Sequence, residues 1–253
     1  MTTLPSDPEM ADRILIGIGR EAFKHARDLL HAARLILDAE IWSVAYANAA
    51  LALEEIGKAA LCSAILPMPL AQRQAEVDAF PDRFTSHEAK SFSAHLVLRI
   101  AEEGATEGME QIFKRAERDA KRTNKNKFRG LYVDYKNTGH LLRPGDITKA
   151  QASELISTVD RVLTLSADAE DAMGQPEIYL SFIRQLRDTY GSADVWQDLA
   201  EGMDEILPAI SAIARDELSP QEALKATGLG ALLDGLVPMQ TVGPASDDQK
   251  EPV

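Results

Sequence analysis

The sequence predicts an all-α fold. Long stretches rich in Ala, Leu, Glu, Arg and Lys return apolar residues every three or four positions, which is the period of an α-helix. Runs of β-branched residues that alternate with polar ones are scarce, and aromatic residues make up only 6% of the chain. With 253 residues, 45% of them hydrophobic, the chain is long enough for one or two domains with a buried core.

Two long helices are expected at the start of the chain. The first begins after Pro8 and ends near Asp38, and the second runs from about Ile41 to Leu66. Pro67 and Pro69 stop the second helix, because proline lacks the amide hydrogen that a helix interior requires. The short connection between the two predicts an antiparallel helical hairpin.

Further helices follow, separated by one irregular segment. Thr85 or Ser86 is placed to cap a helix over residues 87–103, which Gly104 ends, and another helix is expected over about 106–125. Residues 128–146 combine β-formers with glycine and proline and lack a 3.6-residue period, so an ordered loop with a short extended piece is expected there. Thr148 is a plausible N-cap for a helix that continues toward Met173.

The C-terminal third is acidic. From Glu170 to Val253 there are 16 Asp and Glu residues against 5 Lys and Arg. Helical patterns are expected over about 177–190, 193–216 and 220–236, followed by a tail rich in Pro, Gly and Ser that predicts disorder. The expected division is a helical bundle over 9–173, an acidic helical region over 176–237 and a disordered tail over 238–253.

Charge and cysteine content limit the functional classes. The net charge of -13 should repel nucleic acid and anionic lipid, so a role on nucleic acid requires a local basic patch. Cys62 is the single cysteine, which excludes an internal disulfide and a cysteine-rich zinc site and fits a reducing cytoplasm. No signal-peptide pattern and no run of about 18 apolar residues is present, so neither secretion nor a membrane span is expected.

The second predicted helix places charged residues in an apolar stretch. Glu54 and Glu55 lie four and three residues before Lys58, so at least one carboxylate reaches the ammonium group on the same helix face. One interpretation is a solvated ion pair of little energetic weight. The other is a polar site inside the bundle, because apolar residues flank the group and Gly57 lets another backbone approach.

We expect different roles for the two histidines in the helix over 87–103. His87 and Lys90 lie in its first turn, where the positive end of the helix dipole favours the neutral imidazole that a general base requires. The alternative is an exposed first turn with no chemical role. His95 lies among apolar residues and is expected to be a hydrogen-bonded core residue.

A basic stretch runs from Lys114 to Arg129, with four Lys and four Arg against Glu117 and Asp119. Its net charge of +6 contrasts with the rest of the chain and is able to neutralise several phosphates. Equally, the stretch is able to pair with the acidic C-terminal third. The residues expected to bind RNA are Lys121, Arg122, Lys125 and Lys127.

Common cofactor and metal motifs are missing from the sequence. It contains no P-loop, no dinucleotide-binding glycine pattern, no zinc-protease His-Glu-x-x-His and no Glu-x-x-His of the di-iron bundles. No nucleophile elbow marks a serine hydrolase. Neither a metal nor an organic cofactor is therefore expected.

Three segments together resemble the AbiV family of bacterial abortive infection proteins, which is related to the HEPN helical domains. They are residues 50–59 (ALALEEIGKA), 87–90 (HEAK) and 128–134 (FRGLYVD). The resemblance covers about residues 15–170. It implies a HEPN-like helical bundle used in anti-phage defence, in which an infected cell stops growing because its RNA or translation apparatus is attacked or blocked.

Many HEPN domains are metal-independent ribonucleases that carry an Arg-x4-6-His pair in a late helix. Here the spacing occurs only as Arg20 and His25 in the first helix, so the nuclease residues do not transfer directly. Our hypothesis for RNA cleavage makes His87 the base. Lys58, Lys90 and Arg129 then hold the phosphate, Glu55 orients Lys58, and Glu54, Tyr132 and Asp134 have structural or loop-positioning roles.

The alternative is a non-catalytic helical protein that inhibits translation or senses a phage protein by surface contact. In that case the same charged side chains form a buried and mutually satisfied network, whereas catalysis requires an accessible His87. A homodimer through the first two helices is compatible with their Ala- and Leu-rich faces. The acidic C-terminal third is further hypothesised to mask the basic stretch until infection.

Overall fold

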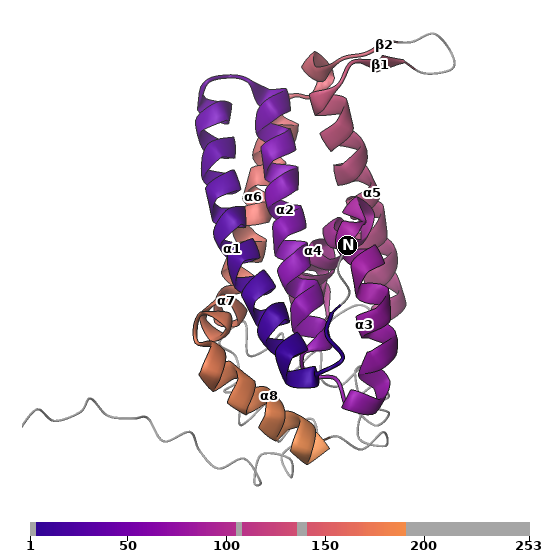
Figure 1. Ribbon diagram of the computed structural model, residues 1–253. Helices are drawn as coiled ribbons and strands as arrows, with labels where there is room; N and C mark the ends of the chain where they lie inside the picture. Colours follow the sequence, from indigo (N-terminus) through magenta and orange to yellow (C-terminus); the bar gives the residue numbers. More distant parts are fainter. Residues whose placement is uncertain (1–3, 105–107, 136–140, 191–253) are drawn as a thin grey trace, which may run out of the picture.

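The computed structural model describes residues 4–104, 108–135 and 141–190, and these form a helical bundle (Figure 1). Eight α-helices, one 3₁₀ turn and a two-stranded hairpin make up the described part of the chain. The elements are α1 (Pro8–Asp38), α2 (Trp42–Ile65), α3 (Leu70–Thr85), α4 (His87–Glu103), α5 (Met109–Leu131), β1 (Asp134–Tyr135), β2 (Leu141–Leu142), η1 (Pro144–Asp146), α6 (Lys149–Leu165), α7 (Ala167–Gly174) and α8 (Pro176–Tyr190). The all-α prediction is confirmed.

Helices α1 and α2 form the expected antiparallel hairpin. The Asp7 carboxylate caps α1 by accepting hydrogen bonds from the amides of Glu9 and Met10. Three residues connect the two helices, and among them Glu40 takes a left-handed backbone conformation with φ of 61°. This tight turn places the two helices side by side along most of their length (Figure 1).

Helix α2 lies at the centre of the bundle, where α1, α4, α5 and α6 all pack against it. Many small alanines let these neighbours approach from several sides, and Leu53 and Ile56 are fully buried among them. Cys62 is also fully buried in this helix, and burial raises the pKa of its thiol to about 12. None of the described helices combines the length and apolar character needed to cross a membrane.

A glycine allows α4 to cross close to α2. A Cβ atom at Gly57 would lie 1.8 Å from the carbonyl oxygen of Lys90 and 2.5 Å from its carbonyl carbon, so no other residue fits without a backbone shift. The missing side chain at Gly57 lets the first turn of α4 pack directly over the middle of α2. It therefore sets the position of every side chain in that turn.

Helix α3 over Leu70–Thr85 was not predicted. Its N-cap is Pro69, which we expected to end the preceding helix, and Pro81 lies inside it. These prolines interrupt the sequence pattern, although a proline near a helix start is compatible with helical geometry. Ser86 then separates α3 from α4 and caps α4 by accepting a hydrogen bond of 3.2 Å from the amide of Ala89.

Helix α5 continues to Leu131, so the expected irregular segment begins later than predicted. Gly130 is helical and lies against the N-terminal end of α2, where an added Cβ would lie 2.8 Å from the carbonyl oxygen of Ser43. We had taken this glycine as a sign of a loop, whereas it permits a close helix contact. A short hairpin follows, in which Asp134 pairs with Leu142 and Tyr135 with Leu141.

The last described helices close one end of the bundle. The expected N-cap Thr148 forms a capping box with Gln151 at the start of α6, and the helix breaks at Ser166 before α7. Helix α8 agrees with the prediction over 177–190 and packs against α1 through buried Leu180 and Ile183. The helices expected over 193–216 and 220–236 and the tail over 238–253 lie outside the described residues.

Candidate functional site

One buried carboxylate joins three helices at the centre of the bundle. Glu54, on α2, is only 3% exposed. One of its oxygens lies 2.7 Å from Nδ1 of His87 and 3.8 Å from Nζ of Lys90, both in the first turn of α4. Its other oxygen accepts a hydrogen bond from the ammonium group of Lys127 on α5. We call these four residues the Glu54 cluster.

The Glu54 cluster contains more positive than negative charge. Lys90 and Lys127 are 6% and 2% exposed, so two buried ammonium groups share one carboxylate. Burial lowers the pKa of Lys90, and the attraction of Glu54 opposes that shift. Lys127 also lies 3.1 Å from Nδ1 of His87. Such a group is stable only while the shared carboxylate is present.

His87 forms the outer edge of the Glu54 cluster. Its side chain is 48% exposed, and no described residue forms a hydrogen bond with its Nε2. The ring of Phe128 lies edge-on to the imidazole at 6.0 Å, and Tyr132 stacks on Phe128 at 6.4 Å between ring centroids. Phe128 is 43% exposed and Tyr132 60%. An accessible imidazole therefore lies beside an exposed aromatic pair.

The sequence profile of the AbiV family within the HEPN domains (HEPN_AbiV) matches residues 15–164. That range covers more than half of the chain and all of α2 to α5. The chain belongs to the AbiV family. The family consists of bacterial abortive infection proteins, so this chain is a bacterial anti-phage defence protein. No curated protein and no solved structure matches the chain.

The second charged pair of α2 lies outside the Glu54 cluster. Nζ of Lys58 lies 2.6 Å from the Glu55 carboxylate, and the two side chains are 22% and 15% exposed. His25 of α1 approaches the same carboxylate at 3.8 Å. Both interpretations of this stretch therefore apply in this AbiV-family chain, since Glu54 is an interior group and Glu55 with Lys58 is a partly exposed ion pair.

Two expected site residues are located elsewhere. Arg129 points away from the Glu54 cluster and pairs with Asp146 in η1 at 3.0 Å, because two positions along a helix turn a side chain to nearly the opposite face. Asp134 lies in β1, where its backbone pairs with Leu142. Among the described residues no hydrogen bond or ion pair joins Arg129 to His87 or Lys90, so the structure does not bring it together with Lys58 and Lys90.

The basic stretch is largely paired within the bundle. Lys121 pairs with Glu117, and Arg122 lies 3.5 Å from Asp119 and 3.8 Å from Glu154. Lys125 is exposed and has no ion-pair partner among the described residues. Lys127 is interior, in contrast to the RNA-contacting surface position we expected, because it lies on the face of α5 that packs on α2.

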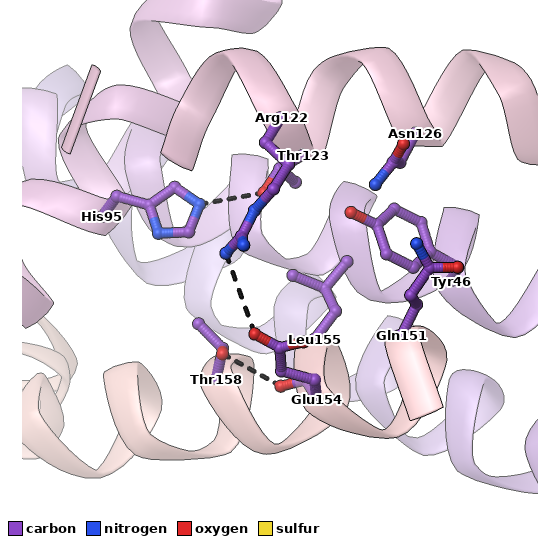
Figure 2. Close-up of a pocket in the computed structure, with 9 residues that line it drawn as sticks. All are labelled: Tyr46, His95, Arg122, Thr123, Asn126, Gln151, Glu154, Leu155 and Thr158. Atoms are coloured by element: carbon purple, nitrogen blue, oxygen red, sulfur yellow. Dashed lines mark hydrogen bonds and ion pairs between the residues drawn. The ribbon is translucent and has the colours of Figure 1, made fainter. Parts of the chain in front are cut away.

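A polar pocket of about 90 Å³ opens between α2, α4, α5 and α6 (Figure 2). His95 lies in its wall as the hydrogen-bonded core residue we expected, with Nε2 3.0 Å from the hydroxyl of Thr123. Burial lowers the pKa of His95 to about 4. Figure 2 shows Arg122 reaching toward Glu154 across the pocket. The pocket is lined by Tyr46, His95, Arg122, Thr123, Asn126, Gln151, Glu154, Leu155 and Thr158.

Sequence reasoning did not anticipate the pocket or the contribution of Lys127 to the Glu54 cluster. The missing signal was the helical face of α5, since Thr123 and Lys127 are four residues apart and both are buried toward α2 and α4. Among the described residues no group of three or more His, Cys, Asp and Glu side chains is arranged to hold a metal.

Proposed function

We propose that this defence protein acts as a metal-independent ribonuclease on single-stranded RNA, with His87 as the general base. The observation that carries the proposal is the contact of 2.7 Å between Glu54 and Nδ1 of a half-exposed His87. A carboxylate on Nδ1 holds the proton on that nitrogen and leaves Nε2 as the basic atom. Nε2 has no partner among the described residues, so it is available to a substrate.

In the proposed reaction Nε2 of His87 takes the proton from a ribose 2′-hydroxyl. The 2′-oxygen attacks phosphorus, the bond from phosphorus to the 5′-oxygen breaks, and the leaving oxygen takes a proton from water. Lys90 and Lys127 lie behind the imidazole and supply positive potential for the phosphorane charge. Glu54 is a positioning residue that acts through His87.

The aromatic pair beside His87 supports a single-stranded substrate. Phe128 and Tyr132 stack on each other and remain exposed on the same side as the imidazole. Exposed aromatic rings bind unpaired bases by stacking, at about 1–3 kcal/mol per base. Lys125, on the same helix, is an exposed cation without an ion-pair partner in the described part of the chain, so it is placed to meet a phosphate.

The test is induction of the wild type and of His87→Ala in a bacterial host, followed by growth and total RNA on a gel. The proposal expects growth arrest with RNA fragments in the wild type and neither in His87→Ala. His31→Ala is the matched control, because His31 is an exposed histidine of α1. Equal amounts of RNA fragments in cells with wild type and with His87→Ala would contradict the assignment of His87 as the general base.

A second candidate function is a non-catalytic effector that blocks translation by binding. The observation that favours it is the burial of Glu54, Lys90 and Lys127, which satisfy one another inside the bundle. This candidate expects arrest of growth with intact RNA, and the same arrest in folded His87→Ala protein. Incorporation of labelled amino acids in a purified translation extract then separates blocked translation from RNA loss.

A further inference from the structure

The polar pocket between α2, α4, α5 and α6 is separate from the proposed nuclease site. Asn126 lines the pocket, whereas Phe128, two residues further along α5, lies against the ring of His87. Two positions along an α-helix turn a side chain by about 200°, so the pocket and His87 lie on opposite sides of α5. The pocket therefore requires an explanation of its own.

The floor of the pocket is polar but carries no charge at pH 7. Tyr46, His95 and Thr123 are each 4% exposed and line it. Burial raises the pKa of Tyr46, although hydrogen bonds with Asn126 and Thr123 oppose that shift, so the phenol stays protonated. Burial lowers the pKa of His95 to about 4, so the imidazole is neutral. The floor therefore favours a part of a ligand that is polar and uncharged.

Two side-chain amides extend this neutral polar surface. Asn126 is the partner of the Tyr46 hydroxyl group. The side-chain oxygen of Gln151 accepts a hydrogen bond of 2.9 Å from the amide of Thr148, and no described residue accepts one from the amino group of Gln151. Figure 2 shows Tyr46, Asn126 and Gln151 close together and apart from the pair of Arg122 and Glu154.

Opposite charges lie at the mouth of the pocket. The side chains of Arg122 and Glu154 are 60% and 67% exposed, and 3.8 Å separates their nearest nitrogen and oxygen, which is too long for a hydrogen bond. Asp119 lies 3.5 Å from Arg122 but already accepts two hydrogen bonds from Arg99. No described residue accepts a hydrogen bond from Arg122, so its accessible guanidinium group has donors to offer a ligand.

We propose that this pocket binds a free α-amino acid with a small, polar and uncharged side chain. The ligand carboxylate accepts hydrogen bonds from Arg122, whose planar fork matches two carboxylate oxygens. The ligand ammonium group pairs with Glu154, because an α-amino acid carries both charges on one carbon atom and Arg122 and Glu154 are similarly close. The ligand side chain enters toward Tyr46 and Thr123. A volume of about 90 Å³ equals about three water molecules and limits that side chain to a few heavy atoms.

The test is calorimetric titration of the full chain with L-serine and L-asparagine, together with thermal unfolding in their presence. Saturable binding is expected for at least one of them, with a Tm about 3–6 °C higher at about ten times its Kd. The absence of saturable binding of both up to about 10 mM overturns the proposal.

Two analogues of L-serine test the zwitterion. 3-Hydroxypropionate lacks the amino group and ethanolamine lacks the carboxylate, so each should bind at least about tenfold more weakly than L-serine. The same comparison applies to L-asparagine with succinamate and 3-aminopropionamide. An analogue without the amino group that binds as tightly as its amino acid leaves Glu154 without a role and contradicts the proposal.

A variant locates the ligand. Arg122→Gln removes the guanidinium group at an exposed position, so the protein should fold normally and bind the amino acid at least about tenfold more weakly. Arg118→Gln makes the same change at an exposed position of α5 outside the pocket and should bind it as the wild type does. Wild-type affinity in Arg122→Gln contradicts the assignment. None of these measurements involves RNA or His87, so their outcome is independent of the proposed nuclease activity.

Discussion

At the scale of single residues, Glu54 supplies the negative charge that compensates the buried lysines of the bundle interior. Removing that charge should therefore strongly destabilise the fold. Glu54→Gln keeps the shape of the side chain and leaves Lys90 and Lys127 buried without a counter-ion. Breaking a buried pair in this way costs about 3–5 kcal/mol, and we expect the free energy of unfolding in urea to fall by that amount.

The adjacent residue provides the matched control for Glu54→Gln. Glu55→Gln removes the partner of Lys58, but both of those side chains reach solvent, so we expect a loss of about 1 kcal/mol or less. Similar losses in the two variants would show that the Glu54 cluster does not have the energetic role argued here.

His95 should make the stability of the fold depend on pH. Burial lowers its pKa in the folded protein to about 4 from an ordinary value of 6.5. Between these values the unfolded chain binds a proton that the folded protein does not, so stability falls as the pH falls. From pH 7 to pH 5 this amounts to about 2 kcal/mol.

Urea denaturation of wild type and His95→Gln at several pH values measures this contribution. The stability difference between the two proteins should change by about 2 kcal/mol across that range, because glutamine does not titrate. His31→Gln, at an exposed position of α1, should show no comparable change. A constant difference for His95→Gln would mean that the imidazole titrates normally.

At the scale of elements, the crossing of α2 and α4 depends on one missing side chain. Gly57→Ala places a Cβ against the backbone carbonyl of Lys90, so the helices must separate or the carbonyl must move. We expect a loss of about 1–3 kcal/mol in the free energy of unfolding, together with weaker activity if His87 acts as proposed.

Gly17→Ala is the control for Gly57→Ala. It changes a glycine inside α1 where an added Cβ meets nothing within 4 Å. Because alanine favours a helix interior, this variant should gain about 0.5–1 kcal/mol. Opposite signs for the two substitutions are the expected result in thermal or urea unfolding, and a loss at both positions would contradict the packing argument.

The sequence was sufficient for elements with strong periodicity and clear caps. The bounds of α1, α2, α4 and α8 were predicted to within a few residues, and Thr148 was correctly placed as an N-cap. Pro81 made α3 hard to predict and Gly130 made the last turn of α5 hard to predict, since both residues are locally unfavourable for a helix. Gly130 is accepted because it permits the close contact with the carbonyl oxygen of Ser43. Local propensity alone does not contain that information.

For the site, the sequence revealed which charged residues share one helix, but it did not reveal which helices contact one another. Glu54 was selected because charged residues in an apolar stretch require an explanation, and His87 and Lys90 were selected because they lie in the first turn of a helix. Lys127 appeared as one of many lysines, since only the packing of α5 on α2 distinguishes it from Lys125. Arg129 was grouped with Lys90 because its helical face was not known, and the structure pairs it with Asp146.

At the scale of the whole molecule, the position at which the chain is truncated should determine how much stability is lost. A chain that ends after Gln175 lacks α8, and with it buried Leu180 and Ile183 and Arg187, which is one of the two arginines paired with Asp12. A chain that ends after Tyr190 keeps them. We expect the shorter chain to be less stable than the longer one by about 3 kcal/mol or more, measured by urea unfolding.

The chain that ends after Tyr190 also tests whether the acidic C-terminal residues mask the basic stretch. Residues 191–253 contain 12 Asp and Glu against 3 Lys and Arg, so their removal makes the net charge much less negative. If they mask α5, RNA should bind the chain of residues 1–190 more tightly than the full chain, with a steeper dependence on salt. Equal affinity and equal salt dependence would argue against masking.

The single cysteine gives this protein an internal reporter of its own opening. A thiol reacts with alkylating reagents as the thiolate, and both burial and the raised pKa suppress that form of Cys62 while α2 is packed. Alkylation should therefore proceed only through molecules in which the central helix is exposed to solvent. Because the sequence has no second cysteine, the modified fraction counts such openings one molecule at a time, without an engineered label.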